Sequence, residues 1–202
     1  MINRYIVMLL ACSLFSLFLY TETDAMDAQA YLEKGNAYFN EKQYDEAIQN
    51  YGKALSTKPD FSDAYYNRGL AYYKRGRYSE AVADFTKVLE MNPKYTEVYY
   101  NRGLAHYKKG HHEKAIEDYT KAISLNPNLA EVYLNRGIAY AYNNQYEEAI
   151  DDYNKAILLR PNYESAYFNR GVAYTRKAAA DFRKVCDMGN KLACDNFKQI
   201  SD

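Results

Sequence analysis

Residues 62–95 read SDAYYNRGLAYYKRGRYSEAVADFTKVLEMNPKY, and residues 96–129 follow as TEVYYNRGLAHYKKGHHEKAIEDYTKAISLNPNL. The two segments match in length, and their glycines, aromatic residues and prolines fall at the same positions. All four prolines of the chain keep this spacing of 34 residues: Pro59, Pro93, Pro127 and Pro161. A sequence period of this length predicts one helix–turn–helix unit per repeat.

Each unit contains two apolar stripes with helical spacing. Counted from the first residue of a unit, positions 4, 8 and 11 share one face of a first helix, and positions 20, 24 and 27 share one face of a second. Position 8 is always glycine, which costs about 1 kcal/mol relative to alanine inside a helix. The recurring glycine therefore predicts close helix contact, with the aromatic residues of positions 4, 11 and 24 packed in the core. At positions 4 and 11 these are Tyr31, Tyr65, Tyr99, Tyr133, Tyr167, Tyr38, Tyr72, His106, Tyr140 and Tyr174.

This pattern resembles the tetratricopeptide repeat (TPR) family over residues 28–185, with four full units and an altered fifth. The resemblance implies an all-α fold, a right-handed superhelical solenoid of antiparallel helix pairs. Stacking is required because no single unit buries its apolar face alone. The expected repeats are 28–61, 62–95, 96–129 and 130–163, followed by a degenerate fifth repeat with C-terminal capping helices over 164–202.

The fifth unit lacks about five residues between Tyr174 and Phe182, including the turn between its helices. Its apolar residues keep helical spacing across the deletion. That spacing predicts one continuous helix over residues 164–188 and a last helix over 191–200. A truncated hairpin is the alternative.

Cys186 and Cys194 are the two cysteines that follow the repeats. Eight residues along an unbroken helix rise about 12 Å, too far for a disulfide. Gly189 and Asn190 between them form a helix stop signal, so the chain can fold back there. The spacing also resembles that of the cysteine-rich Sel1-like repeat proteins, which join successive helices in this way. We favour a structural disulfide over two buried free thiols or a redox function.

Residues 1–25 precede the repeats and resemble a secretory signal. Arg4 stands before an apolar run over residues 6–20, and small and polar residues lead to Ala25. The run is shorter than the roughly 20 residues of a membrane-spanning helix. We expect cleavage after Ala25 and export, to the periplasm or the medium. Two alternatives remain open: the residues up to Cys12 resemble a bacterial lipoprotein box, which would leave Cys12 lipidated, and the segment could stay uncleaved as an anchor.

Asparagine occupies position 6 of units two to five, on the side of the first helix opposite the core stripe. Its amide offers donors and an acceptor, which suits the backbone of an extended peptide. The set resembles the asparagine ladder of the O-GlcNAc transferase superhelix, which holds a bound peptide backbone. Local or inter-repeat hydrogen bonding is the alternative role. The predicted concave groove consists of Asn67, Asn101, Asn135, Asn169, Tyr66, Tyr100, Phe168, Tyr73, Tyr107, Lys74 and Lys108.

Some TPR co-chaperones grip the C-terminal carboxylate of a chaperone with a clamp of lysine, asparagine and arginine side chains. Asn36 and Asn67 match the two asparagines of that clamp. Leu32, Glu97 and Asn101 stand where it needs basic residues. The sequence therefore argues against this mode of binding.

Two charged positions also recur. Arginine at position 7 is predicted to lay its stem along the neighbouring helix and to pair with acidic residues. An aspartate recurs on the second helix, which indicates a solvated or ion-paired face and no catalytic pair. These residues are Arg68, Arg102, Arg136, Arg170, Asp84, Asp118 and Asp152.

Composition and motifs exclude several classes of function. The formal net charge is zero, which argues against nucleic acid as the main partner. The motifs of zinc peptidases, nucleotide-binding loops and serine hydrolases are missing from the sequence. His111 and His112 are adjacent and do not share a helix face, so no metal or cofactor is expected.

The sequence thus predicts a non-enzymatic scaffold that binds an extended peptide segment of a partner protein, in cell-envelope assembly. A self-associating structural component is the alternative. Membrane contact is expected only through an N-terminal anchor or a lipidated Cys12.

Overall fold

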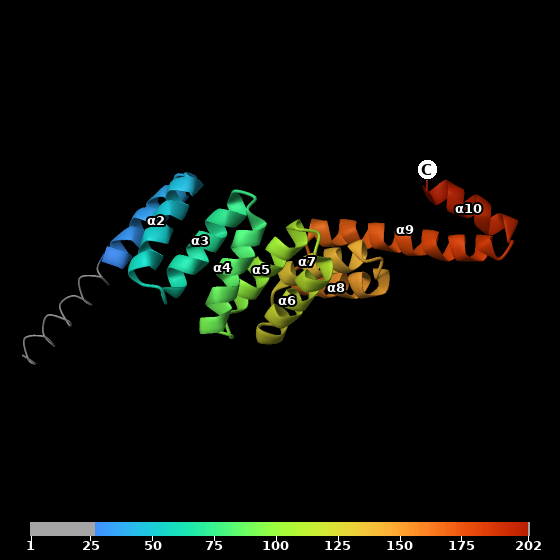
Figure 1. Ribbon diagram of the computed structural model, residues 1–202. Coiled ribbons are helices and arrows are strands. Elements are labelled where there is room, and N and C mark those ends of the chain that lie inside the picture. The colour runs from blue at the N-terminus through green and yellow to red at the C-terminus, as the bar shows by residue number, and fades with distance from the viewer. Residues whose placement is uncertain (1–26, 202) are drawn as a thin grey trace, which may run out of the picture. The chain divides into compact units, whose positions relative to one another are not determined.

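The structure, a computed structural model, describes residues 27–201, and every regular element in that range is an α-helix (Figure 1). The predicted signal peptide and Cys12 lie outside the described residues. The helices form the all-α array of antiparallel pairs that the repeat pattern predicts.

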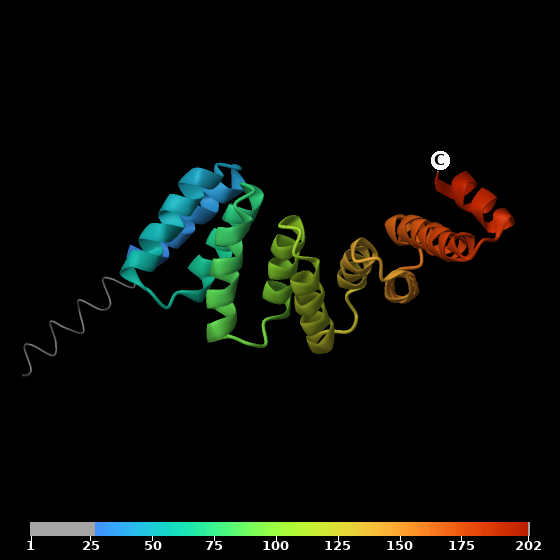
Figure 2. The same ribbon diagram turned by 45° about the vertical axis from the view of Figure 1, so that its right-hand side comes forward.

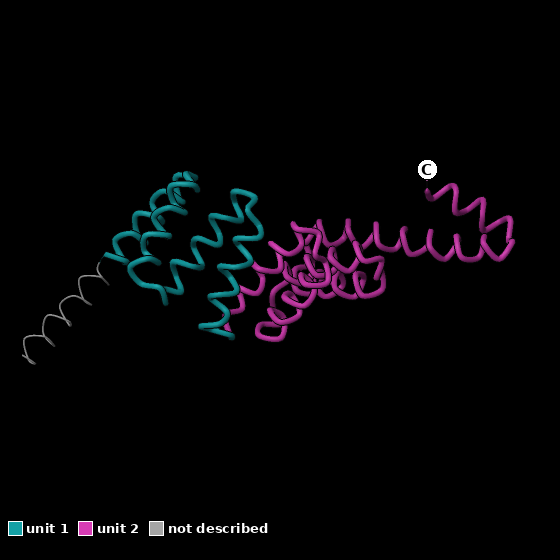
Figure 3. The backbone as a smooth tube through the Cα atoms, viewed as in Figure 1, with its two compact units in different colours: residues 1–93 teal, residues 94–202 magenta. Residues whose placement is uncertain are grey.

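The chain divides into two compact units, residues 1–93 and residues 94–202 (Figure 3). The first unit contains a helix over residues 27–40, α2 (Tyr44–Thr57), α3 (Ser62–Lys74) and α4 (Tyr78–Met91). The second unit contains α5 (Thr96–Lys108), α6 (His112–Leu125), α7 (Ala130–Tyr142), α8 (Tyr146–Leu159), α9 (Glu164–Asp187) and α10 (Lys191–Ser201).

A tight turn at one fixed position separates the two helices of each regular repeat. Position 15 has a positive φ in all four: 61° at Lys42, 76° at Gly76, 75° at Gly110 and 60° at Asn144. The next N–H then donates back across the end of the first helix, as Arg77 N does to Tyr72 O at 2.9 Å. This closure satisfies carbonyls that the helix end would otherwise leave unpaired.

The position-8 glycines of the four regular repeats have the packing role that the sequence predicts, whereas a Cβ atom added to Gly171 of the fifth unit would meet nothing within 4 Å. A Cβ atom added to Gly69 would lie 2.8 Å from the ring of Phe85, and one added to Gly103 would lie 2.6 Å from the ring of Tyr119. Both rings are fully buried. The first and second helices therefore approach so closely that only glycine fits beneath the ring.

The recurring arginine and aspartate pair with each other in the second, third and fourth repeats. Nε and Nη2 of Arg102 donate to the two carboxylate oxygens of Asp118 at 2.9 and 2.7 Å. Arg68 with Asp84 and Arg136 with Asp152 have the same bidentate geometry. The prediction of an arginine pairing with acidic residues is confirmed for these three arginines, and their aspartates are buried, not solvated. Arg170 instead donates from Nη1 to Oδ1 of Asn154 at 2.7 Å.

α9 is one continuous helix through the fifth unit, as its spacing predicts, and α10 folds back beside it (Figure 2). A disulfide joins Cys186 of α9 to Cys194 of α10, the pairing favoured from the sequence. The expectation that positions 4 and 11 are core residues is wrong here. Tyr167 is 46% exposed and Tyr174 is 52% exposed, because the continuous helix leaves them without a second helix of their own.

Candidate peptide-binding site

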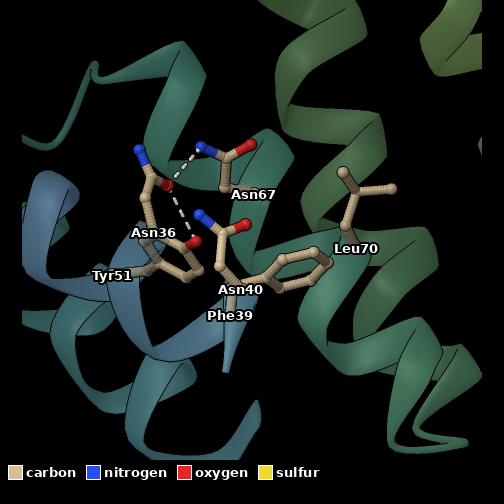
Figure 4. Close-up of a pocket in the computed structure, with 6 residues that line it drawn as sticks. All are labelled: Asn36, Phe39, Asn40, Tyr51, Asn67 and Leu70. Atoms are coloured by element: carbon tan, nitrogen blue, oxygen red, sulfur yellow. Dashed lines mark hydrogen bonds between the residues drawn. The ribbon is translucent and has the colours of Figure 1, made fainter. Parts of the chain in front are cut away.

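The first compact unit contains a cavity of about 330 Å³ whose lining combines carboxamides with apolar walls (Figure 4). The helix over residues 27–40 contributes three of the lining residues, α2 contributes one and α3 contributes two. They are Asn36, Phe39, Asn40, Tyr51, Asn67 and Leu70.

A shared acceptor organises the polar side of this cavity. Oδ1 of Asn36 accepts hydrogen bonds from the Tyr51 hydroxyl at 2.9 Å and from Nδ2 of Asn67 at 3.0 Å. Burial raises the pKa of Tyr51 to about 12, so its hydroxyl stays a proton donor at neutral pH. With its oxygen engaged twice, Asn36 directs its Nδ2 away from both donors (Figure 4). A ligand carbonyl is the natural acceptor for such an N–H.

The apolar side of the cavity consists of Phe39 and Leu70, which are both half-buried. The Phe39 ring packs against Tyr44 with centroids 5.4 Å apart, so the turn after the helix holds it in place. Asn40 is exposed beside it. The cavity can therefore hydrogen-bond a peptide unit and bury an adjacent aliphatic or aromatic side chain.

The four predicted ladder asparagines are all half-buried, and each of them interacts with other residues of the chain. Asn67 donates to Asn36, and Asn135 donates to the Tyr100 hydroxyl and to the Glu131 carbonyl, both at 3.0 Å. Asn169 donates to the Ser165 carbonyl at 2.7 Å. Within the described part of the chain, no donor reaches the Oδ1 atoms of these three asparagines. Local bonding, the alternative role, therefore uses one N–H group of Asn67 and of Asn169 and both N–H groups of Asn135, and it leaves the three amide oxygens open.

The predicted groove aromatics divide between two kinds of contact. Tyr66 and Tyr100 each tilt against the buried position-24 ring of their own repeat, at 6.0 Å from Phe85 and 6.1 Å from Tyr119. Tyr73 and Tyr107 instead pack near the turns, at 5.4 Å from Tyr78 and 5.6 Å from Tyr142. These four rings are half-buried, so each has structural contacts and an accessible edge.

The remaining predicted residues are open to solvent. Lys74 and Lys108 are exposed, and Phe168 on α9 is 73% exposed. The structure therefore does not gather all predicted groove residues around one cavity. Only Asn67 of the set lines the cavity in the first unit.

A second cavity, of about 460 Å³, lies in the second unit between the N-terminal ends of α5 and α7 and the loop that follows α8. Tyr100 is the predicted residue that lines it. Glu97 and Glu131 supply carboxylates, and Leu129 and Leu159 supply apolar surface. Two acidic groups beside apolar walls suit a basic or amphipathic side chain of a ligand.

The groove predicted from the sequence does not include Asn36 and Asn40, although the sequence contains a signal for them. The first repeat carries asparagine at positions 9 and 13, where the second carries Leu70 and Lys74. Tyr51 was predicted as a core residue, and its ring is indeed buried. That its hydroxyl reaches the cavity depends on three-dimensional contacts that the repeat pattern does not encode.

Within residues 27–201, no group of three or more histidine, cysteine, aspartate or glutamate side chains could hold a metal ion. None of the helices described is both long and apolar enough to cross a membrane.

Paired helices, a fixed turn and a ring over glycine in every regular unit define a helical repeat protein with a carboxamide-lined cavity. Tetratricopeptide repeat families match residues 35–76, 69–110, 96–129, 118–151 and 139–177. The chain belongs to the tetratricopeptide repeat family. No curated protein sequence matches it.

Several solved structures resemble the chain. The crystal structure of MamA protein is 26% identical with a TM-score of 0.73, over 86% of this chain and 90% of that chain. The first TPR of Spaghetti (RPAP3), bound to the HSP90 peptide SRMEEVD, is 31% identical with a TM-score of 0.56, over 58% and 93%. The Arabidopsis OM64 TPR domain is 28% identical with a TM-score of 0.54, over 55% and 93%.

Proposed function

We propose that this protein is a non-enzymatic scaffold that binds an extended peptide segment of a partner protein. The observation that carries the proposal is the cavity of the first unit, where Asn36 and Asn40 stand beside the apolar side chains of Phe39 and Leu70. Carboxamides can hydrogen-bond a peptide backbone whatever its sequence, and the apolar walls select the side chain between the bonded peptide units.

The comparison with Spaghetti supports this function, since that TPR domain is bound to a peptide and is 31% identical to this chain over 58% of this chain. The charges of this chain point to a different peptide. Leu32, Glu97 and Asn101 occupy the positions where a carboxylate clamp needs basic side chains. We therefore propose a ligand that is recognised through its backbone and an apolar side chain, without a terminal acidic group.

Isosteric substitutions in the cavity test the proposal without emptying the core. Asn36→Asp keeps an oxygen for the Tyr51 hydroxyl and for Asn67, and it replaces the outward N–H with a carboxylate oxygen. Asn40→Asp does the same at the rim. Peptides selected from a library of short unstructured sequences should bind the wild-type chain and lose at least about tenfold in affinity for the double variant, because two donors become repulsive acceptors.

Gln49→Glu is the matched control, since Gln49 is exposed on α2 of the same unit and outside the cavity. It adds a negative charge of the same kind and should leave peptide affinity unchanged in calorimetric titrations. Equal affinity of the wild-type chain and the Asn36→Asp/Asn40→Asp variant would remove the cavity from the binding site.

We further propose that the protein acts outside the cytosol, in cell-envelope assembly. The signal-like pattern of residues 1–25 supports export, and the Cys186–Cys194 disulfide is of a kind that persists in oxidising compartments. Fractionation of cells that express the full chain, with N-terminal sequencing of the product, tests this. Mature protein that begins at Met26 outside the cytosol supports cleavage. A product that retains residues 1–25 in the cytosol contradicts export.

A structural, self-associating role is the second candidate. The exposed tyrosines of α9, Tyr167 and Tyr174, favour this self-associating role.

A further inference from the structure

α9 presents a face that the equivalent helix of every regular repeat buries. A Cβ atom added to Gly35, Gly69, Gly103 or Gly137 would collide with the ring above it, at 2.5 to 2.8 Å. One added to Gly171 would meet nothing within 4 Å. The glycine, with Tyr167 and Tyr174 on either side, forms the same receiving surface as in the other repeats, without the ring that covers it.

The neighbouring helices of α9 occupy other faces. Ala166 and Ala173 are buried in a cluster with Tyr153 of α8. α10 is attached on the adjacent side, through the disulfide of Cys186 and through Arg183 above the Phe197 ring, and its Ile200 borders a cavity that Tyr167 and Gly171 also line. Successive residues of an α-helix lie 100° apart around its axis. By this spacing, the uncovered residues of α9 occupy an arc of about 80° between the side that faces α8 and the side that faces α10, and we call them the open stripe. The stripe consists of Tyr167, Gly171, Tyr174, Ala178, Phe182 and Val185.

The second half of α9 carries the pattern of a covering helix. Residues 178–185 read AAADFRKV, and residues 81–88 at the core-facing part of α4 read AVADFTKV, with six of eight residues identical. In α4 the alanine, phenylalanine and valine of this pattern are fully buried, and Asp84 binds Arg68. Ala178, Phe182, Val185 and Asp181 are the matching residues of α9.

This covering pattern cannot reach the receiving surface of its own chain. In the second repeat eight residues, 73–80, separate the two patterns, and they include the turn at Gly76. In α9 only residues 175–177 separate them, and all three are helical. Arg170 and Asp181 therefore lie about 16 Å apart along one helix.

We propose that two copies of this chain pair through α9, antiparallel, so that each receiving surface is covered by the other copy. Gly171 would lie beneath the partner's Phe182, Tyr167 beside the partner's Val185, and Tyr174 beside the partner's Ala178. The three pairs centre on residue 176 or within half a residue of it, which is also close to the midpoint of α9. A single two-fold axis near this residue would therefore bring the receiving surface and the covering pattern of each copy into contact with the other copy, as a closed dimer requires.

Charge complementarity selects a second copy as the occupant. In the second, third and fourth repeats the arginine before the glycine binds the aspartate before the ring, as Arg102 binds Asp118 at 2.7 Å. In the antiparallel pair, Arg170 would bind the partner's Asp181, and the two-fold axis would form this ion pair twice. Arg170 already lies over the Tyr167 ring at 5.1 Å, the placement that Arg102 has over Tyr99 at 5.6 Å.

Sedimentation velocity of the full chain over a series of concentrations tests the pairing. We expect a monomer–dimer equilibrium for the wild-type chain. Arg170→Asp and Asp181→Arg should each weaken dimerisation by at least about tenfold, because each places like charges opposite one another twice. An equimolar mixture of the two variants should dimerise again, because both ion pairs of the heterodimer then join opposite charges.

Two further variants separate this interface from a general loss of folding. Gly171→Ala should favour the helix in the monomer yet block the partner's Phe182, so dimerisation falls while helicity by circular dichroism does not. Lys184→Asp changes an exposed lysine about 120° around α9 from the centre of the stripe and should leave the dimer intact. A wild-type chain that stays monomeric at every concentration would overturn the proposal, and so would a dimer that is indifferent to Gly171→Ala and Arg170→Asp.

Discussion

The third repeat and the long helix α9 contain the same first-helix pattern in two different environments. In the third repeat, Tyr119 of α6 lies fully buried over Gly103 of α5, and Asp118 beside it holds Arg102. In α9 the glycine is uncovered, and the matching Phe182 and Asp181 lie farther along the same helix. Deletion of one turn therefore converts an intramolecular core contact into an exposed surface. Both regions belong to the second compact unit, so paired substitutions compare them directly.

Removal of the covering ring should give the largest difference. Tyr119→Ala empties a fully buried site and should lower the free energy of unfolding by about 3 to 5 kcal/mol. Phe182→Ala at a half-buried site should cost no more than about 1 kcal/mol in the monomer. Urea denaturation at low protein concentration measures both. Similar losses for the two variants would mean that α9 has an intramolecular cover.

Loss of the aspartate should rank second. Asp118→Ala leaves the partly buried Arg102 guanidinium without its carboxylate and should destabilise the chain by about 2 to 3 kcal/mol. Asp181→Ala on exposed α9 should stay within about 0.5 kcal/mol of wild type. Thermal and urea unfolding give the comparison, and a loss of more than about 1 kcal/mol for Asp181→Ala would contradict it.

Alanine at the glycines should change stability in opposite directions. Gly103→Ala forces a Cβ atom to within 2.6 Å of the Tyr119 ring and should cost about 1 to 3 kcal/mol. Gly171→Ala meets open space and should gain up to about 1 kcal/mol from helix propensity. The same unfolding measurements apply. Equal destabilisation by both would show that the α9 glycine is covered as the others are.

The smallest predicted effect concerns His106, which replaces the position-11 tyrosine in the third repeat only. Burial and the nearby Arg102 lower the pKa of His106 to about 4, with Asp118 at 4.0 Å from its Nε2. His106 binds a proton below about pH 6.5 in the unfolded chain but only below about pH 4 in the folded chain. The free energy of unfolding should therefore fall by about 1 to 2 kcal/mol between pH 7 and pH 5 because of this group.

His106→Tyr supplies the control for that effect, since tyrosine occupies the same position as Tyr72 and Tyr140 in the neighbouring repeats. The variant retains the pH dependence of every other group. Its loss of stability on acidification should therefore be smaller than that of the wild-type chain. Parallel pH profiles for the two proteins would show that His106 already titrates normally in the folded state.

Much of the fold followed from residue spacing, because helical periodicity is a local property. Pro93 and Gly103 mark where a helix ends and where two helices meet, and each can be recognised from its position in the repeat. The candidate site is less predictable from residue spacing than the fold is. Asn67 was predicted, but its bond to Asn36 joins residues from different repeats, and a pattern within one repeat contains no information about that contact.

The amino-acid sequence by itself determined the period, the pairing of helices, the continuous helix α9 and the cysteines that close its end. These depend on which residues follow one another at intervals of three, four and 34. Only the tertiary structure decided that the Tyr51 hydroxyl and Asn67 share one oxygen of Asn36, and that Gly171 has no ring above it. Both depend on which surfaces meet after folding, because hydrogen bonds and burial arise between residues that are distant along the chain.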